Sequence, residues 1–61
     1  MNQFVVDYYE SIFKNEIMIM QLEGTTKTLK ELAAEFVIRD EAHSDEILTA
    51  YANVRKEVIG S

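Results

Sequence analysis

The first third of the chain carries more apolar surface than one neighbouring helix can cover. From Phe4 to Leu22, 12 of 19 residues are apolar or aromatic, and on a helical wheel they cover an arc of about 220°. A helix that packs against a single neighbour needs roughly half of that arc. Because the whole chain has only 61 residues, the excess apolar face predicts a partner.

The size and composition of the chain favour oligomerisation as the source of additional stability. A chain of 61 residues allows one domain, and a domain of this size buries only about 60% of the surface of its unfolded form. No cysteine is present, which excludes disulfides and cysteine-ligated zinc or iron–sulfur sites. We expect no cofactor, and we expect a homo-oligomer, with a dimer favoured.

The charge of the chain argues against nucleic acid and anionic lipid as partners. The formal net charge is −5, which repels phosphate groups. The basic side chains are scattered along the sequence: Lys14, Lys27, Lys30, Arg39, Arg55 and Lys56. We therefore predict that a target is a protein with a basic surface, and the charge disfavours nucleic acid as a partner.

No segment has the pattern of a membrane span or a secretion signal. The longest strictly apolar run is Ile17 to Met20, whereas a membrane-spanning helix needs about 20 residues. A basic start followed by a long apolar run, which is typical of a signal peptide, is also missing. These observations predict a cytoplasmic protein that does not contact a membrane.

Turn and capping residues divide the chain into helices. Gly24 can end a first helix, and Gly60 can end the last one. Between them, Thr28 and Glu31 have the spacing of a capping box. No segment alternates as a half-buried strand would. The sequence predicts an all-α domain over 1–61, with a helix at about 3–22, a turn at about 23–27 and a second helix from about 28 to 39.

Two interpretations remain open for residues 40–44. Either the second helix continues to Ile59, or it kinks or breaks at 40–44 and a third helix begins at about 45, with Ser44 as its N-cap residue. At 1.5 Å per residue, an unbroken second helix would extend some ten residues beyond the first. The alternatives are thus a helical hairpin or a small three-helix unit, and either one would close into a helical bundle as a homodimer.

Asp40 and His43 have a spacing that occurs in metal sites. A carboxylate followed by histidine three residues later is typical of carboxylate-bridged di-iron sites in helical bundles. A complete site needs carboxylates from four helices and two such motifs, which one copy of this chain does not contain. We therefore predict no metal site. We expect the two residues to flank a break or to form a partly solvated polar layer.

A DNA-binding function is the main alternative that the sequence offers. Residues 29–47 partly follow the spacing of a helix-turn-helix, with Leu32 and Ala33 in the first helix and Ile38 after the turn. Val37 occupies the turn position that is commonly glycine. The following helix would be acidic, which is unfavourable beside phosphates. This alternative is a regulator with a degenerate helix-turn-helix.

The residues that catalysis requires are scarce. A single histidine, no cysteine and three serines do not assemble a nucleophile with a base and an orienting group. We predict a small acidic non-enzymatic regulatory or inhibitor protein that binds proteins through its helices; a structural or assembly subunit is a further alternative. The predicted interface consists of apolar residues at helical spacing: Val5, Tyr9, Ile12, Phe13, Ile17, Met20, Phe36, Ile47, Tyr51, Val54 and Val58.

Overall fold

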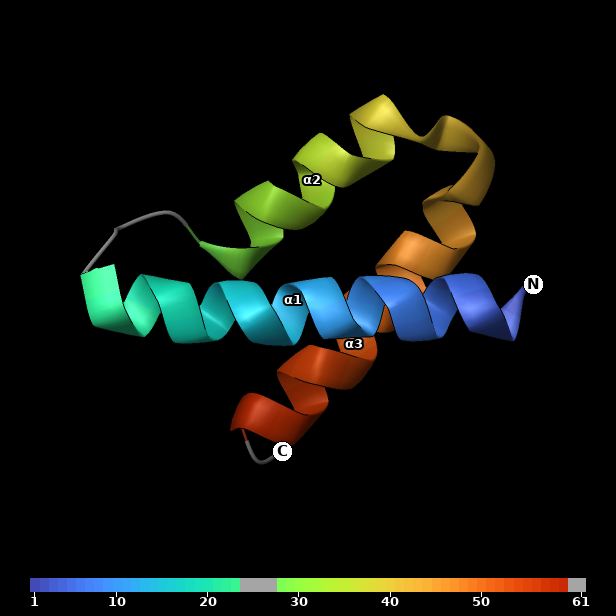
Figure 1. Cartoon of the computed structure of the whole chain (residues 1–61). Coiled ribbons are helices and arrows are strands. Elements are labelled where there is room, and N and C mark those ends of the chain that lie inside the picture. The colour runs from blue at the N-terminus through green and yellow to red at the C-terminus, as the bar shows by residue number, and fades with distance from the viewer. Residues whose placement is uncertain (24–27, 60–61) are drawn as a thin grey trace.

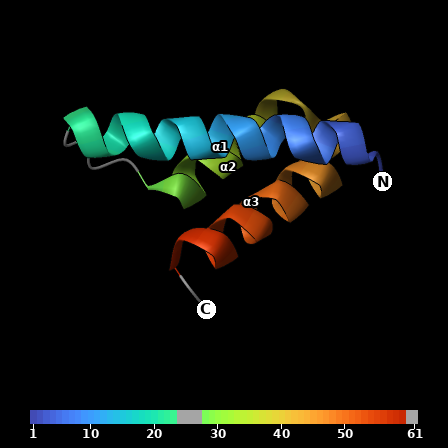
Figure 2. The same cartoon turned by 60° about the horizontal axis from the view of Figure 1, so that its bottom comes forward.

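The computed structural model describes residues 1–23 and 28–59, with side chains described within 1–20 and 28–57, and every regular element within these ranges is a helix. Its elements are α1 (Gln3–Glu23), α2 (Leu29–Arg39), the short 3-10 helix η1 (Glu41–His43) and α3 (Ser44–Ile59). Both α2 and α3 are inclined to the longest helix, α1, and α3 crosses it (Figures 1 and 2). The prediction of an all-α domain is confirmed, and the arrangement is the three-helix unit.

Short polar side chains cap the first two helices. Asn2 accepts the backbone N–H of Phe4 at 2.9 Å with its side-chain oxygen, so it serves as the N-cap residue of α1. Thr28 caps α2, because its Oγ1 accepts the backbone N–H of Glu31 at 3.2 Å. The start of the second helix is confirmed. Gly24 and Gly60, predicted to end helices, lie outside the described residues.

The helical conformation ends after α2, although no glycine or proline is present there. The backbone N–H of Asp40 donates to the carbonyl of Phe36 at 2.9 Å, but Asp40 itself has φ −137° and ψ 65° and leaves the helix. The backbone carbonyl of Asp40 accepts the N–H of His43 at 3.0 Å, which begins the short 3-10 turn that follows. Of the two interpretations of residues 40–44, the break is confirmed.

The role predicted for Ser44 is wrong. An N-cap residue has extended backbone angles, whereas Ser44 has helical values of φ −57° and ψ −39°. It follows directly on η1 and is the first residue of α3. The non-helical backbone at this break lies instead at Asp40, four residues earlier.

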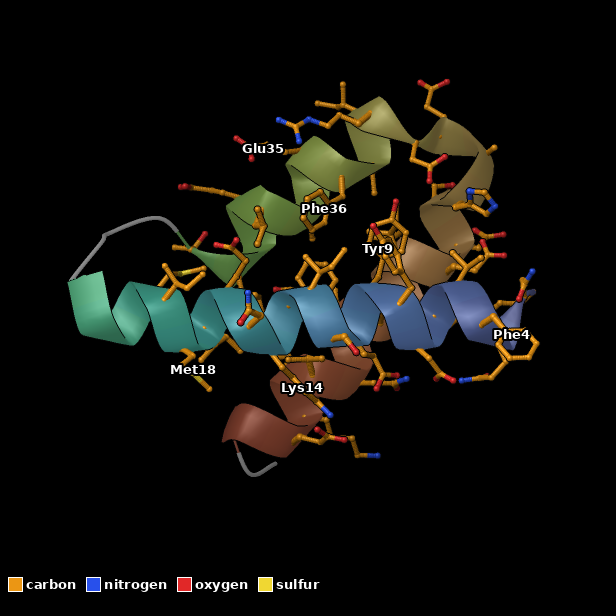
Figure 3. All side chains as sticks on the ribbon, viewed as in Figure 1. Phe4, Tyr9, Lys14, Met18, Glu35 and Phe36 are labelled. Atoms are coloured by element: carbon orange, nitrogen blue, oxygen red, sulfur yellow. The ribbon has the colours of Figure 1, made fainter. Side chains whose placement is uncertain are left out.

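The core lies where one side of α1 meets both other helices. The largest fully buried side chains are Phe13 and Val6 from α1 and Ile47 and Val54 from α3. Phe36 of α2 joins them, with its ring centroid 5.5 Å from that of Phe13. Figure 3 shows Phe36 pointing from α2 toward α1. The break at Asp40 thus allows α3 to cover a second part of the apolar arc of α1.

Candidate functional site

Several residues predicted to form the interface belong to the chain's own core. Tyr9, Phe13, Ile47 and Val54 are buried within the single chain, so they are not available to a partner in this fold. This part of the predicted interface is corrected: the break allows α3 to pack against α1, and these side chains are buried between the helices of the single chain. The remaining predicted residues with described side chains are partly buried against the core: Val5, Ile12, Ile17, Met20, Phe36 and Tyr51. The side chain of Val58 lies outside the described residues.

The exposed apolar surface lies on the opposite side of α1. Phe4, Tyr8 and Met18 are 86%, 62% and 60% exposed, and Ser11 and Asn15 are exposed between them. These five residues, at alternating separations of four and three, form one face of the helix. Figure 3 shows Phe4 and Met18 pointing away from α2. We call this set the outer face of α1.

Two exposed apolar residues on the other helices stand apart from the outer face. Ile38 belongs to α2 and is 77% exposed, and Leu48 belongs to α3 and is 52% exposed. Single exposed apolar residues are common on protein surfaces, whereas several at helical spacing on one face are not. Among the described residues, α1 is therefore the helix on which exposed large apolar side chains follow one another along a face.

One edge of the outer face is polar and is tied to α3. The Lys14 ammonium lies 3.2 Å from a carboxylate oxygen of Glu57, and the Asn53 side-chain amide donates to Glu10 at 2.9 Å. All four side chains are at least partly exposed, so these contacts contribute little to stability. They show on which side of α1 the helix α3 lies, and they leave the outer face uncovered.

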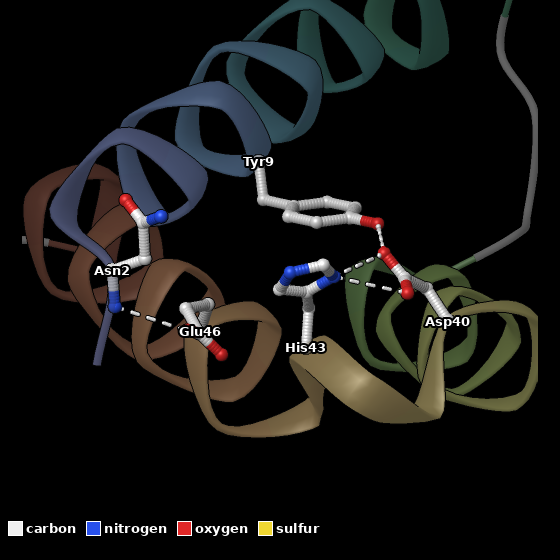
Figure 4. A network of polar contacts seen from close by, with 5 residues as sticks. All are labelled: Asn2, Tyr9, Asp40, His43 and Glu46. Carbon is white, nitrogen blue, oxygen red and sulfur yellow. Dashed lines mark hydrogen bonds and ion pairs between the residues drawn. The ribbon is translucent and has the colours of Figure 1, made fainter.

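A polar cluster joins α1 to the break between α2 and α3 (Figure 4). The Tyr9 hydroxyl donates to Asp40 Oδ2 at 2.8 Å. His43 Nδ1 lies 3.1 Å from Oδ1 and 3.0 Å from Oδ2 of the same carboxylate. These contacts lower the pKa of Asp40, with the hydrogen bond from Tyr9 the largest cause and that from His43 the second. Burial, together with the Asp40 carboxylate, raises the pKa of Tyr9 to about 12.

A second carboxylate, Glu46, anchors the start of the chain. The Glu46 side chain is only 8% exposed, and its Oε2 accepts the backbone N–H of Asn2 at 3.0 Å. This hydrogen bond is the largest cause of the lowered pKa of Glu46. Because Asn2 also caps α1, Glu46 links the N-terminus of α1 to the first turn of α3.

The cluster supports a structural role for its side chains. The Asp40 carboxylate is engaged by Tyr9 and His43, so a metal ion would have to displace contacts that already hold α1 against the break. No group of three or more metal-ligating side chains occurs among the described residues. Asp40 and His43 flank the break, as one of the two sequence interpretations expected.

The structure does not have a turn at the position that the helix-turn-helix motif requires. Its turn was placed at Val37, but α2 continues through this residue to Arg39. Ile38, expected at a buried apolar position after the turn, is largely exposed. The chain does change direction in this region, but at residues 40–43, several positions later than the motif requires.

Sequence reasoning missed the outer face and the role of Glu46. The spacing of Phe4, Tyr8 and Met18, which puts them on one face of a helix, is visible in the sequence, but an arc of about 220° does not indicate which of its edges is left exposed. For Glu46, an acidic residue in a first helical turn has an ordinary explanation in the helix dipole. Its contact with Asn2 spans 44 positions, and no local pattern indicates it.

Comparisons with known proteins identify no relative from which a function could be transferred. No protein-family model matches the chain, and no curated protein or solved structure is significantly similar to it. Within the described ranges, no helix has the length and apolar character needed to cross a membrane.

Proposed function

We propose that this chain is a small, acidic, non-enzymatic regulatory or inhibitor protein that binds other proteins through a helix face and forms homo-oligomers. The observation that carries the proposal is the outer face of α1. Phe4, Tyr8 and Met18 remain exposed although the chain already has a core to which all three helices contribute. An apolar face of this kind on a soluble domain marks an interaction surface.

The charge of the chain supports a basic surface as the target. The formal net charge is −5, and Asp7 and Glu10 lie on the polar side of α1 next to the outer face. An apolar strip with carboxylates along one edge fits a partner whose apolar groove has lysine or arginine along the matching edge, because such complementarity increases the association rate and selects the partner.

The two alternative functions have less support. A helix-turn-helix protein would need the turn at Val37, where α2 is continuous. A structural or assembly subunit would use the same outer face of α1 without a separate target. The two functions therefore differ in the partner: a regulator binds a different protein through the outer face, whereas a structural or assembly subunit binds only copies of itself.

Affinity purification with matched variants tests the proposal. The variant Phe4→Ser/Tyr8→Ser removes two of the three large apolar side chains of the outer face, and Ile38→Ser removes a similarly exposed one from α2. We expect the wild type and Ile38→Ser to retain a common protein from the source cell, and the double variant to lose it. Identical retention by all three chains, or a shift of DNA by the chain at low salt, would overturn the proposal.

A further inference from the structure

We infer that the outer face of α1 binds the same face of a second copy, with the two α1 helices antiparallel and Ser11 at the two-fold axis. The outer face consists of Phe4, Tyr8, Ser11, Asn15 and Met18. This inference deepens the proposed function by naming one occupant of the surface, and it rests on the same exposed face. Three features of the face indicate a second copy in this orientation.

The first feature is the symmetry of the face about Ser11. Phe4 lies seven positions before Ser11, and Met18 lies seven positions after it. In an antiparallel pair centred on Ser11, the Phe4 ring of each copy faces the Met18 side chain of the other. Sulfur–aromatic contacts of this kind are favourable. The small side chain at the centre allows the two helices to approach closely.

The second feature is the charge along one edge of the face. Asp7 and Lys14 are exposed on the same edge, seven positions apart. A two-fold axis perpendicular to antiparallel helices places equal edges side by side, so Asp7 of each copy lies opposite Lys14 of the other. In a parallel pair the opposite edges meet, and Asp7 would face apolar side chains. The present contacts of both groups, Asp7 with Gln3 and Lys14 with Glu57, are solvent-exposed and cost little to exchange.

The third feature is the opposite edge, which is apolar except for Glu16. Val5, Ile12 and Ile19 lie along it and are only partly buried. Antiparallel pairing brings Ile12 next to Ile12 of the second copy, and Val5 next to Ile19. The pair therefore has Ser11 at its centre, a Phe4–Met18 contact on each side of it, one mainly apolar edge and one edge with two complementary charge pairs. Such an arrangement is favourable for a second copy and specifies its direction.

The area of the face fits a weak, reversible dimer. Phe4, Tyr8 and Met18 together expose roughly 400 Å², given about 200 Å² for a large side chain and their exposed fractions. The outer faces of two copies, together with part of their apolar edges, would bury about 1,000 Å² in total, which is at the lower limit for a specific interface. We expect dissociation in the micromolar range.

Sedimentation equilibrium between about 5 µM and 500 µM tests self-association. We expect the mass to rise with concentration from 7.0 kDa toward twice that value. Phe4→Ser should raise the dissociation constant at least about tenfold, and Ile38→Ser should leave it unchanged. Circular dichroism verifies that both variants keep their helices. A mass of 7.0 kDa at every concentration, or equal effects of both variants, would overturn the inference.

Single-cysteine variants test the orientation, because the natural chain has no cysteine. Under mild oxidation, Ser11→Cys should form a disulfide dimer rapidly, whereas Ala34→Cys, exposed on α2, should not. A mixture of Phe4→Cys and Met18→Cys should form the mixed dimer in preference to either dimer of one kind. Preferred Phe4→Cys homodimers would indicate parallel helices and would overturn the antiparallel arrangement.

The outcomes separate this inference from the proposed function. A chain that stays monomeric but retains a cellular protein through Phe4 and Tyr8 contradicts self-association and supports the regulatory function. A chain that dimerises through the outer face and retains no other protein supports self-association and contradicts the regulatory function. In that case the chain is a structural or assembly subunit.

Discussion

The two sides of α1 carry the same types of apolar residue, but those on one side are buried and those on the other are exposed. Phe13, on the inner side, is completely buried between α2 and α3, and its ring lies 5.5 Å from Phe36 and 6.2 Å from Tyr51. Phe4, nine positions earlier and therefore on the opposite side of the helix, is 86% exposed. Hydrophobicity alone does not distinguish them. The difference arises because two short helices cover one side of α1 and leave the other free.

The two sides should therefore respond differently to the same substitution. Removing an inner side chain leaves a cavity and lowers the free energy of unfolding of the single chain. Removing an outer side chain changes little in the single chain and weakens its association with a partner.

The largest effect is expected for Phe13→Ala. Truncation of a fully buried phenylalanine costs about 3–5 kcal/mol, which is most of the stability of a 61-residue domain. We expect this variant to be largely unfolded by circular dichroism at low micromolar concentration, where association contributes little.

The matched control for Phe13→Ala is Phe4→Ala. Because Phe4 is exposed, its removal should change the free energy of unfolding by no more than about 0.5 kcal/mol. Equal destabilisation by the two variants would contradict the assignment of an inner and an outer side.

A smaller effect is expected in α3, where Val54 is fully buried and Leu48 is 52% exposed. Val54→Ala should cost about 2 kcal/mol, because two buried methyl groups are lost. Leu48→Ala should cost about 0.5 kcal/mol or less, although it removes more atoms. Urea denaturation measures both values, and a larger loss for Leu48→Ala would show that α3 presents a different side to α1.

The smallest effect is expected from acid, which acts on the polar contacts at one end of the inner side. The folded chain lowers the pKa of Asp40 from 3.8 and that of Glu46 from 4.5. Their contribution to stability is therefore complete above these ordinary values and is lost as the pH falls through the lowered ones. We expect a lower urea midpoint at about pH 3 than at pH 7.

Asp40→Asn provides the control for this pH dependence. Asparagine does not titrate, so the variant should lose less stability between neutral and acidic pH than the wild type does. Glu41→Gln, which changes an exposed carboxylate beside the cluster, should keep the full dependence. Equal losses in the wild type and Asp40→Asn would show that the contacts of Asp40 with Tyr9 and His43 do not stabilise the fold.

Local signals in the sequence predicted the helices and, as one of two interpretations, the break. Thr28 caps α2 as its spacing with Glu31 indicated, because capping depends on residues within one turn. The break at Asp40 remained open, because it depends on a carboxylate whose partner Tyr9 lies 31 positions away. Ser44, the obvious local candidate for a cap, is an ordinary helical residue.

Tertiary contacts determine which apolar residues of α1 and α3 are buried, and the periodicity of the sequence does not. The sequence indicated that α1 has too much apolar surface, but it assigned Phe13, Ile47 and Val54 to an interface. The path of α3 places these side chains in the core. The same path of α3 leaves Phe4 and Met18 exposed. The sequence therefore shows that α1 has an unpaired apolar face, but only the fold shows where on α1 this face lies.

The most direct test of the two-sided helix is the concentration dependence of its NMR spectrum. Backbone and methyl chemical shifts, recorded from about 10 µM to 1 mM, should change at Phe4, Tyr8, Ser11, Asn15 and Met18. Those of Ala34 and Ile38 on α2 should stay constant. Shifts that do not depend on concentration, or that change mainly around Ile38 or Leu48, would contradict the assignment of the outer face of α1 as the surface where two copies meet.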